Sequence, residues 1–266
     1  MDQERGPGGI DTSVAHPARI YDYWLGGKDN FAADREVGAA IVAASPDFVE
    51  VSRQNRAFLS RAVGHLAGQA GVTQFLDIGT GIPTAGNTHE VAQAAAPDAK
   101  TVYVDNDPVV LAHAQALLVG ETPGSTAYIH ADLRDPDTIL DGARATLDFD
   151  RPVAVMLLGI AEFIPDAEIP DIVARLMAPL ASGSALVISH STAIVDPEGM
   201  AEAARLWNEG GSTPIRLRST DEIAALFTGL DMMEPGVVSC SLWHPGPSQI
   251  GAPAPVDAFA AVGRKR

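Results

Sequence analysis

The stretch FLDIGTGIPT, residues 75–84, decides the fold of this chain. Its apolar beginning is typical of a buried strand. Two glycines follow, Gly79 and Gly81, and a helix is expected to begin near Thr84. Glycine lets the backbone adopt positive φ and approach a ligand closely. A helix N-terminus offers unpaired N–H groups to a polar ligand. A tight turn without a ligand would give the same pattern, so the stretch predicts a local structure before it predicts a function.

Short apolar runs alternate with helical segments from Thr73 onward. Crossover-length segments separate the first five runs, which predicts parallel strands joined by right-handed βαβ connections. A stretch rich in Pro and Gly, 244–255, joins the last two runs, which could therefore pair antiparallel. The predicted strands are 74–79, 101–106, 126–132, 152–159, 184–190, 236–243 and 256–263, and the predicted helices are 85–96, 108–119, 136–147, 167–180 and 219–229.

The N-terminal quarter has a different pattern. Residues 1–15 read as a loose arm, and apolar residues at spacings of three and four then predict helices as far as Gly71. Breaks are expected at Gly26-Gly27 and Ser45-Pro46. We therefore predict an arm and helical region over 1–71 and a Rossmann-like core over 72–266, with a helix-like insert at 193–210.

The composition bounds the function. Of the 266 residues 46% are hydrophobic and 20% charged, which is typical of a globular protein. The net charge of −16 disfavours binding to nucleic acid and to anionic membrane surfaces. The single cysteine, Cys240, excludes an internal disulfide, and the histidines show no metal-ligand spacing. The polar, glycine-rich start and the lack of a membrane-length apolar run predict a cytoplasmic protein. The cysteine count and the histidine spacing predict no metal site.

Acidic residues mark the ends of three consecutive predicted strands. Asp77, Asp105 and Asp132 lie one strand–helix–strand step apart, so all three are expected at the carboxyl edge, where open α/β sheets bind ligands. Asp105 could accept both hydroxyls of a ribose, and Asp132 is placed to accept from an adenine amino group. Each aspartate alone could be a helix cap, and this is the interpretation we favour for Asp107, which precedes a proline.

The charge of this edge indicates the cofactor. The dinucleotide fingerprint needs a third Gly or Ala where this chain has Thr84, and Asp77 would repel a pyrophosphate. S-adenosylmethionine carries an ammonium, a sulfonium and a ribose but no phosphate, so carboxylates at 77 and 105 suit it better. Helix-end N–H groups could take its carboxylate. A nicotinamide-dependent oxidoreductase is the disfavoured alternative.

Several motifs then carry a family resemblance. The chain resembles the class I S-adenosylmethionine-dependent methyltransferases and, more specifically, an actinobacterial S-adenosyl methyltransferase family formerly described as a domain of unknown function. The motifs are spread over almost the whole chain. They are PARIYDYWLGGKDNFAADRE (17–36), NRAFLSRAV (55–63), FLDIGTGIPT (75–84), VYVDNDPVV (102–110), EFIPD (162–166), LRSTDEIAALF (217–227) and AVGRK (261–265).

The resemblance implies an α/β fold with a seven-stranded, mostly parallel sheet, an antiparallel last strand and a helical N-terminal cap over the cofactor. Carried over by position, it implies one set of cofactor contacts: Asp77, Gly79, Thr80 and Gly81 at the methionine portion, Asp105 at the ribose, Asn106, Asp132 and Leu133 at the adenine, and Gly159 beside the methyl group. The chain departs from the family where Leu-His usually precedes the Phe of FIPD, because here Ala161-Glu162 stands there.

The segment IYDYWLGGKDNFAADR (20–35) is dense in aromatic and polar residues and predicts a lid. Tyr21 or Tyr23 would face the cofactor, with Lys28, Asp29 and Asn30 as polar contacts. The aromatic residues could instead form the core between lid and sheet. Arg56 could reach the cofactor carboxylate or form a surface salt bridge.

Methyl transfer needs alignment and the exclusion of water, and a general base helps only when the acceptor is a hydroxyl or a protonated amine. Glu162 and His190, with His130, are the predicted candidates. His190 could instead be bonded to the backbone, and Glu162 could simply begin a helix. The insert, with Trp207, is expected to cover the substrate pocket or to pack on the sheet edge.

The sequence therefore predicts methyl transfer from S-adenosylmethionine to an oxygen or nitrogen of an unidentified small molecule. The rival hypothesis is a regulator that binds S-adenosylmethionine or S-adenosylhomocysteine on the same fold without catalysis. The oligomeric state stays open, with a homodimer as one alternative.

Overall fold

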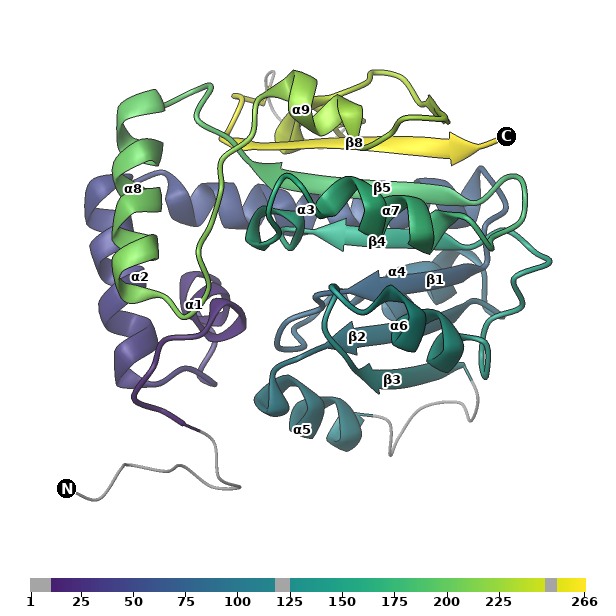
Figure 1. Cartoon of the computed structure of the whole chain (residues 1–266), viewed down its shortest axis with the longest axis horizontal. Helices are drawn as coiled ribbons and strands as arrows, with labels where there is room; N and C mark the ends of the chain where they lie inside the picture. Colours follow the sequence, from purple (N-terminus) through teal and green to yellow (C-terminus); the bar gives the residue numbers. More distant parts are fainter. Residues whose placement is uncertain (1–10, 118–124, 247–252) are drawn as a thin grey trace.

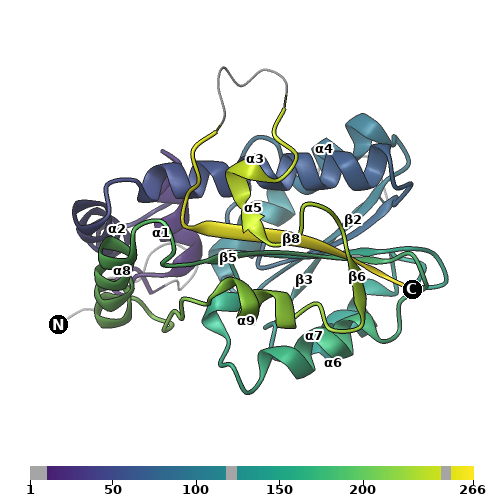
Figure 2. The same cartoon turned by 90° about the horizontal axis from the view of Figure 1, so that it is seen from above.

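A computed structural model describes residues 11–117, 125–246 and 253–266 of the chain. Figure 1 shows a central twisted sheet whose first five strands all point toward a group of N-terminal helices at one end. Seen from above, helices cover both faces of this sheet (Figure 2). Parallel strands covered on both faces read as nearly continuous apolar runs, which is why these runs were visible in the sequence.

The described strands form one sheet in the order β3-β2-β1-β4-β5-β8-β6, with β7 paired to β8 outside this path. β1 to β5 are parallel, and β8 runs antiparallel to its neighbours β5, β6 and β7. The order reverses between β1 and β4, the point at which open α/β sheets bind ligands. The strands are β1 (Gln74–Ile78), β2 (Lys100–Asp105), β3 (Thr126–His130), β4 (Ala154–Leu158), β5 (Ala185–Ser191), β6 (Leu230–Met232), β7 (Val238–Ser239) and β8 (Ala258–Lys265).

Helices α3 and α4 pack on one face of the sheet, and α6, α7 and α9 pack on the other (Figure 2). Side-chain oxygens cap the starts of α6, α8 and α9, since Asp135, Asp196 and Ser219 accept from backbone N–H groups there. The helices are α1 (Pro17–Trp24), α2 (Ala32–Ala44), α3 (Phe48–Gly68), α4 (Thr88–Ala95), α5 (Pro108–Leu117), α6 (Pro136–Ala143), α7 (Ile169–Met177), α8 (Pro197–Gly210) and α9 (Thr220–Ala225). Two 3₁₀ turns, η2 (Ala161–Phe163) and η3 (Cys240–Leu242), follow β4 and β7.

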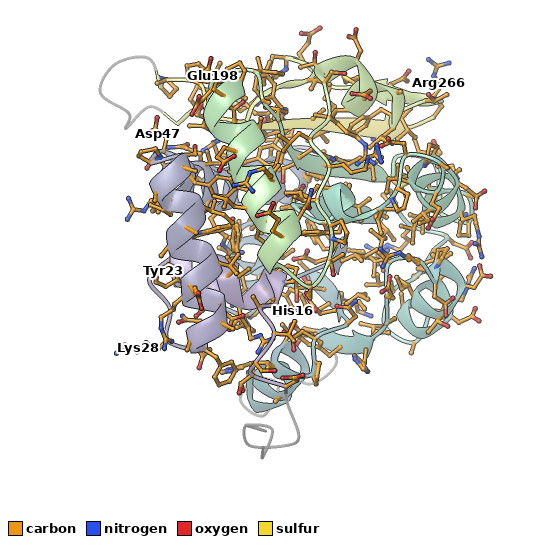
Figure 3. The ribbon with its side chains drawn as sticks, turned by 60° about the vertical axis from the view of Figure 1, so that its left-hand side comes forward. His16, Tyr23, Lys28, Asp47, Glu198 and Arg266 are labelled. Carbon is orange, nitrogen blue, oxygen red and sulfur yellow. The ribbon has the colours of Figure 1, made fainter. Side chains whose placement is uncertain are left out.

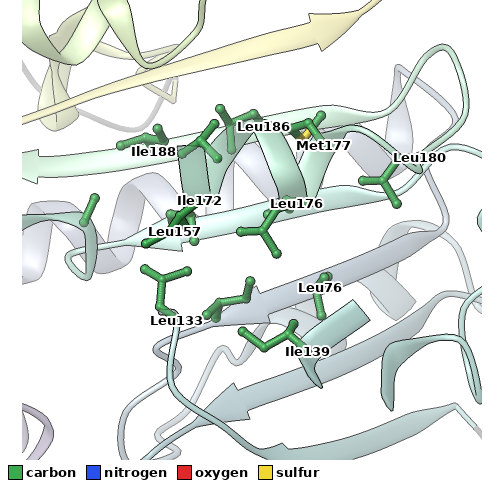
Figure 4. Packing of buried hydrophobic residues seen from close by; sticks show 14 of the residues in the cluster. Leu76, Leu133, Ile139, Leu157, Ile172, Leu176, Met177, Leu180, Leu186 and Ile188 are labelled. Atoms are coloured by element: carbon green, nitrogen blue, oxygen red, sulfur yellow. The ribbon is translucent and has the colours of Figure 1, made fainter. Parts of the chain in front are cut away.

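The larger core fills the face under α6, α7 and α9. Leu76, Leu157 and Leu186 come from three neighbouring strands and meet Ile172 and Leu176 of α7, as Figure 4 shows. All five side chains are at most 4% exposed. This packing fixes the strand ends relative to one another, so it fixes the residues that follow each strand.

A separate apolar cluster joins the N-terminal helices to α8. It contains Trp24 of α1, Ile41 of α2 and Trp207 of α8, and α8 packs against α2. Figure 3 shows α8 standing beside the N-terminal helices at one end of the molecule. The predicted insert 193–210 therefore packs on the N-terminal region, whereas the domain boundary near residue 71 stays a prediction.

The prediction from the sequence was wrong about one strand and missed another. The predicted strand 236–243 contains only the two-residue β7, because the chain then turns through η3 and buries Trp243 against Phe58 of α3, with ring centroids 5.4 Å apart. Arg61 holds this turn by donating to the backbone oxygens of Cys240 and Trp243. The three residues of β6 gave no apolar run, because two of them are exposed. Parts of the predicted arm (1–10), helix (118–119) and loop (247–252) lie outside the described residues.

Among the described residues, no helix is both long enough and apolar enough to cross a membrane.

Candidate active site

One cavity lies between the carboxyl ends of the strands and the helices α1, α3 and α8. Nearly all of the site residues predicted from the sequence line it. They are Tyr21, Arg56, Asp77, Gly79, Thr80, Gly81, Asp105, Asn106, Asp132, Leu133, Gly159, Glu162 and His190. The strand order explains why these residues lie together. The segments that directly follow β1, β2, β3, β4 and β5, here called corners, all meet at the same edge of the sheet.

Asp77 lies buried near the end of β1, with only 5% of its surface exposed. One of its oxygens, Oδ2, accepts a hydrogen bond from the Thr88 hydroxyl at the start of α4, over 2.6 Å. Burial raises the pKa of Asp77 to about 6, although this hydrogen bond and the charge of Arg56 oppose the rise. A cationic ligand group beside this carboxyl would therefore favour its ionised form.

The two glycines of the first corner have the backbone conformation that the motif predicted. Gly79 and Gly81 adopt φ values of 74° and 65°. A Cβ added at Gly79 would lie 2.7 Å from Ile160, so the close approach of these two corners needs glycine there. Between them, the Thr80 hydroxyl lies 3.0 Å from the Tyr128 hydroxyl.

Asp105 ends β2 and binds the first corner directly. Its Oδ2 accepts from the Gly81 N–H and its Oδ1 from the Asp107 N–H, both over 2.9 Å. Burial raises the pKa of Asp105, and these two backbone hydrogen bonds oppose that rise. A carboxylate offers about four acceptor positions, so capacity for two ligand hydroxyls is left.

Asp107 has the cap contact that its position before Pro108 predicted, since its Oδ1 accepts from the Val109 N–H over 2.8 Å. It also makes a second contact, because its Oδ2 lies 2.9 Å from Nδ1 of His16, which lines the cavity. Burial would raise the pKa of Asp107, but the hydrogen bond and charge of His16 outweigh it and lower the pKa.

The corners after β2 and β3 are joined by an amide–carboxylate contact. Asn106 donates from Nδ2 to Oδ2 of Asp132 over 3.0 Å, and the Arg134 N–H donates to Oδ1 of the same aspartate. Leu133 is 4% exposed and adds an apolar surface to this part of the cavity. His130 is not among the residues that line the cavity, and its Nε2 lies 3.1 Å from the Asn106 carbonyl oxygen.

Only some of the residues predicted from the N-terminal helices line the cavity. Tyr21 lines the cavity, donates to the Ser52 carbonyl over 2.9 Å and accepts from Asn55. Asn30 does not line it, because its amide donates to the Asp22 carboxylate and the Gly27 carbonyl and so braces the turn after α1.

Tyr23 and Lys28 are also absent from the residues that line the cavity, and Figure 3 shows both at the outer side of the N-terminal helices. The cavity-facing aromatic residues of α1 are thus Tyr21 and Trp24. Arg56 does reach the cavity, where its Nη2 donates to the backbone oxygens of Ala85 and Gly86 over 3.3 and 3.2 Å.

Glu162 sits in the 3₁₀ turn after β4 and is 5% exposed. Its Oε1 accepts from the Ser191 hydroxyl over 2.9 Å, and its Oε2 has no hydrogen-bond partner among the described residues. Burial raises the pKa of Glu162 to about 7, while Ser191 and the charge of Arg218 oppose the rise. A carboxyl group with a pKa near neutrality can take up and release a proton at physiological pH.

Arg218 holds the turn that carries Glu162. Its guanidinium donates to the backbone oxygens of Ala161 and Ile164, over 2.8 and 2.7 Å, and to Oδ1 of Asp166. Ala161 and Ile164 flank Glu162 and Phe163, so this buried cation fixes the two residues that face the cavity from η2.

His190 is enclosed on both sides of its ring. Nδ1 lies 2.8 Å from the Ser191 carbonyl, to which it can only donate, and Nε2 lies 2.7 Å from Nη1 of Arg218, from which it can only accept. Burial lowers the pKa of His190 to about 4, and the charge of Arg218 adds to the effect. The ring is therefore held neutral with no nitrogen free for a substrate proton, in line with the backbone-bonded alternative for this residue.

Sequence reasoning did not assign a role to several residues of the site. Asn55 links Tyr21 of α1 to Ser189 of β5, since its Oδ1 accepts from the Ser189 hydroxyl over 2.6 Å. Asn55 and Arg218 lie in NRAFLSRAV and LRSTDEIAALF, two of the motifs that carry the family resemblance. Their place in these motifs was the one feature of the sequence that pointed to a role for them. Thr88 carried no signal, because its pairing with Asp77 depends on how α4 packs on the sheet.

The fold and this cavity together define a class I S-adenosylmethionine-dependent methyltransferase, in which acidic strand ends and glycine corners meet at the switch point of the sheet. The S-adenosyl methyltransferase family matches residues 3–266, and the chain belongs to this family.

Solved structures support the assignment. A DUF574 family protein of Streptomyces avermitilis is 46% identical over 96% of this chain and 99% of its own, with a TM-score of 0.91. A protein of Thermobifida fusca assigned to the methyltransferases is 39% identical over 98% of both chains, also with a TM-score of 0.91. A methyltransferase of Anabaena variabilis, 16% identical over 96% of this chain and 98% of its own with a TM-score of 0.52, shares the fold alone. No curated protein is significantly similar to the chain.

Proposed function

We propose that this enzyme transfers the methyl group of S-adenosylmethionine to an oxygen or nitrogen of a small molecule. Glu162 would take up the proton that this atom loses. One observation carries the proposal. A single cavity joins the acidic corners at Asp77 and Asp105 to Glu162, a buried carboxyl group in the turn after β4.

The residues of the corners fit the cofactor by charge and by hydrogen-bonding capacity. Asp77 would pair with the ammonium group, whose positive charge compensates the buried carboxylate. Asp105 would accept both ribose hydroxyls. The further contacts we propose are the backbone of Gly79, Thr80 and Gly81 and the guanidinium of Arg56 at the methionine portion, Asn106, Asp132 and Leu133 at the adenine, and Gly159 near the methyl group.

The N-terminal helices and α8 would close the cavity as a cap. This cap would be formed by the predicted N-terminal region, 1–71, and by the insert at 193–210. Two observations support this proposal. His16, at the start of α1, pairs with Asp107 directly after β2, and Trp207 of α8 lines the cavity together with Trp24 of α1. A closed cap would exclude water and hold the acceptor in line with the methyl group.

When bound, S-adenosylmethionine supplies an activated methyl group. The chain would align the acceptor with the methyl group, exclude water and take up a proton at the Glu162 carboxylate. His190 is not proposed for the last role, because both of its ring nitrogens already have partners. A small-molecule partner stays a prediction, since the acidic composition disfavours nucleic acid. A cytoplasmic location stays a prediction that rests on the single cysteine and on the lack of a membrane-length apolar run.

Calorimetric titration with S-adenosylhomocysteine tests the cofactor site, and transfer of labelled methyl groups to components of a small-molecule cell extract tests the reaction. We expect saturable binding of S-adenosylhomocysteine and label in an organic product. Binding without transfer to any component would favour the regulator instead. Absence of binding would contradict the cofactor site itself.

A further inference from the structure

The half of the cavity that faces the N-terminal helices has a wall of aromatic rings. Phe48 of α3, Trp24 of α1, Trp207 of α8 and Phe163 of η2 follow one another, with successive ring centroids 4.5, 6.0 and 5.6 Å apart. All four residues line the cavity. We name this set the aromatic row. Its last member, Phe163, directly follows Glu162 in the chain.

The aromatic row offers carbon surface rather than hydrogen-bond donors. The indole N–H of Trp24 donates to the Gly38 carbonyl over 3.1 Å, and that of Trp207 donates to the Thr213 carbonyl over 2.8 Å. Both polar edges of the row are therefore already bonded to the protein. Trp24, Phe48 and Trp207 are otherwise packed in the apolar cluster, so what they offer a ligand is the ring surface that lines the cavity, which favours flat, apolar partners.

The polar groups between the row and the strand ends are satisfied among themselves. The Tyr21 hydroxyl donates to one backbone oxygen and accepts from Asn55. The hydroxyls of Ser189 and Ser191 donate to Asn55 and to Oε1 of Glu162. Oε2 of Glu162 is buried and has no partner among the described residues, so it is the acceptor that this network leaves over in a residue that lines the cavity.

From this arrangement we propose, building on the function proposed above, that the methyl acceptor is a small aromatic compound with a hydroxyl group on its ring. The ring lies along the aromatic row, and the O–H donates to Oε2 of Glu162.

A count of donors separates an alcohol from an amine. A hydroxyl has one proton to donate, which matches one unpartnered acceptor. An alkylammonium has three N–H donors, so two of them would be buried without partners beside Glu162, and burying a donor without a partner weakens binding. The ring requirement follows separately from the row, since an aliphatic ring of the same size lacks the favourable geometry of aromatic pairs.

The reaction balances without any further reagent. The hydroxyl proton passes to the Glu162 carboxylate while the oxygen forms a bond to the methyl carbon. The bond between that carbon and sulfur breaks, and its electron pair stays on sulfur. The products are an aryl methyl ether and S-adenosylhomocysteine, and Glu162 then releases its proton to solvent.

The surroundings of Glu162 suit this role. Burial raises its pKa to about 7, above the ordinary value for a glutamic acid, so the carboxylate form is both available and basic at neutral pH. The charge of Arg218 favours the carboxylate. Tyr21 and Cys240, on which the charge of Glu162 acts, stay neutral because burial raises their pKa values.

The first test is binding to the chain saturated with S-adenosylhomocysteine, measured by calorimetry with 2-naphthol, decahydro-2-naphthol and 2-(aminomethyl)naphthalene. We expect 2-naphthol to bind at least tenfold more tightly than either of the others. Failure of S-adenosylhomocysteine to bind would refute the proposed function. Binding of S-adenosylhomocysteine without a preference for 2-naphthol, or with a preference for the amine or the saturated alcohol, would overturn this inference alone.

The second test is transfer of a labelled methyl group to 2-naphthol across pH 5.5–8.5. We expect the rate to rise through about pH 7 in the wild type and to fall at least a hundredfold in Glu162→Gln, whose amide oxygen keeps the 2-naphthol affinity within threefold. Glu168→Gln, an exposed glutamate outside the cavity, is the matched control and should behave as the wild type. Unchanged transfer in Glu162→Gln, or no transfer to bound 2-naphthol in the wild type, would contradict the assignment.

Discussion

Asp105 accepts two backbone N–H groups, so it is already fixed when a cofactor arrives. Asp105→Ala should weaken the binding of S-adenosylhomocysteine by about 3–6 kcal/mol, because two charge-assisted hydrogen bonds of roughly 1.5–3 kcal/mol each would be lost. Calorimetry measures the change. Asp98→Ala, at the exposed corner before β2, is the control. Equal affinity in a folded Asp105→Ala protein would exclude this carboxylate from the ribose site.

Glu162 also predicts how stability depends on pH. Its pKa of about 7 lies above the value near 4.5 in the unfolded chain, so the folded state binds more protons between these values. Its stabilising effect is therefore full below about pH 4.5 and is lost as the pH rises through 7. Asp77, with a pKa of about 6, acts in the same direction.

Glu162→Gln removes this dependence, because the amide stays neutral. We expect the variant to gain stability over the wild type as the pH rises from 5 to 8, by up to about 3 kcal/mol at the upper end. Urea unfolding at several pH values measures the difference. A constant difference between the two proteins across that range would show that Glu162 does not titrate there.

At the scale of elements, the turn η2 depends on a residue from the segment before α9. Arg218 is 4% exposed and uses its guanidinium to hold Ala161, Ile164 and Asp166 together. Arg218→Lys should cost about 2–4 kcal/mol of unfolding free energy, because an ammonium cannot reproduce the planar fork and buried partners are left unpaired.

Arg216 provides a matched comparison. It also pairs with Asp166, over 3.0 Å, but its side chain is 56% exposed. Arg216→Lys should change stability by less than about 0.5 kcal/mol, as is usual for exposed ion pairs. Urea unfolding of both variants separates the two cases. Similar losses for the two substitutions would show that burial of Arg218 does not matter.

The elements also show what sequence could and could not predict. The five parallel strands were predicted because strands buried on both faces leave continuous apolar runs, and Asp77, Asp105 and Asp132 followed because strand ends share an edge. The neutral state of His190 depends on Arg218, 28 residues further on, and the role of Asn55 depends on Ser189. Contacts at such separations leave no periodic signal. Asn30 failed for another reason, because its partner Asp22 lies in the same polar stretch and the sequence does not show which of these polar residues pair with one another.

At the scale of the whole molecule, ligand binding should stabilise the entire fold, because the cavity is built from both the strand corners and the N-terminal helices. S-adenosylhomocysteine at a hundred times its dissociation constant should add about 2.7 kcal/mol to the free energy of unfolding. Thermal unfolding with and without the ligand measures this shift. NADH at the same concentration should leave the transition unchanged, and a shift with NADH alone would revive the oxidoreductase alternative.

The position of β8 has a consequence for synthesis on the ribosome. β8 lies between β5 and β6, and it pairs with β5 along the full length of that strand. Residues 185–191 emerge long before residues 258–265, so a growing chain carries β5 as an open, apolar sheet edge until the later strand arrives. Such edges pair readily with other chains. Translation that stalls shortly before residue 258 should thus yield an aggregation-prone fragment that holds most of the cavity residues but lacks the strand that closes its sheet.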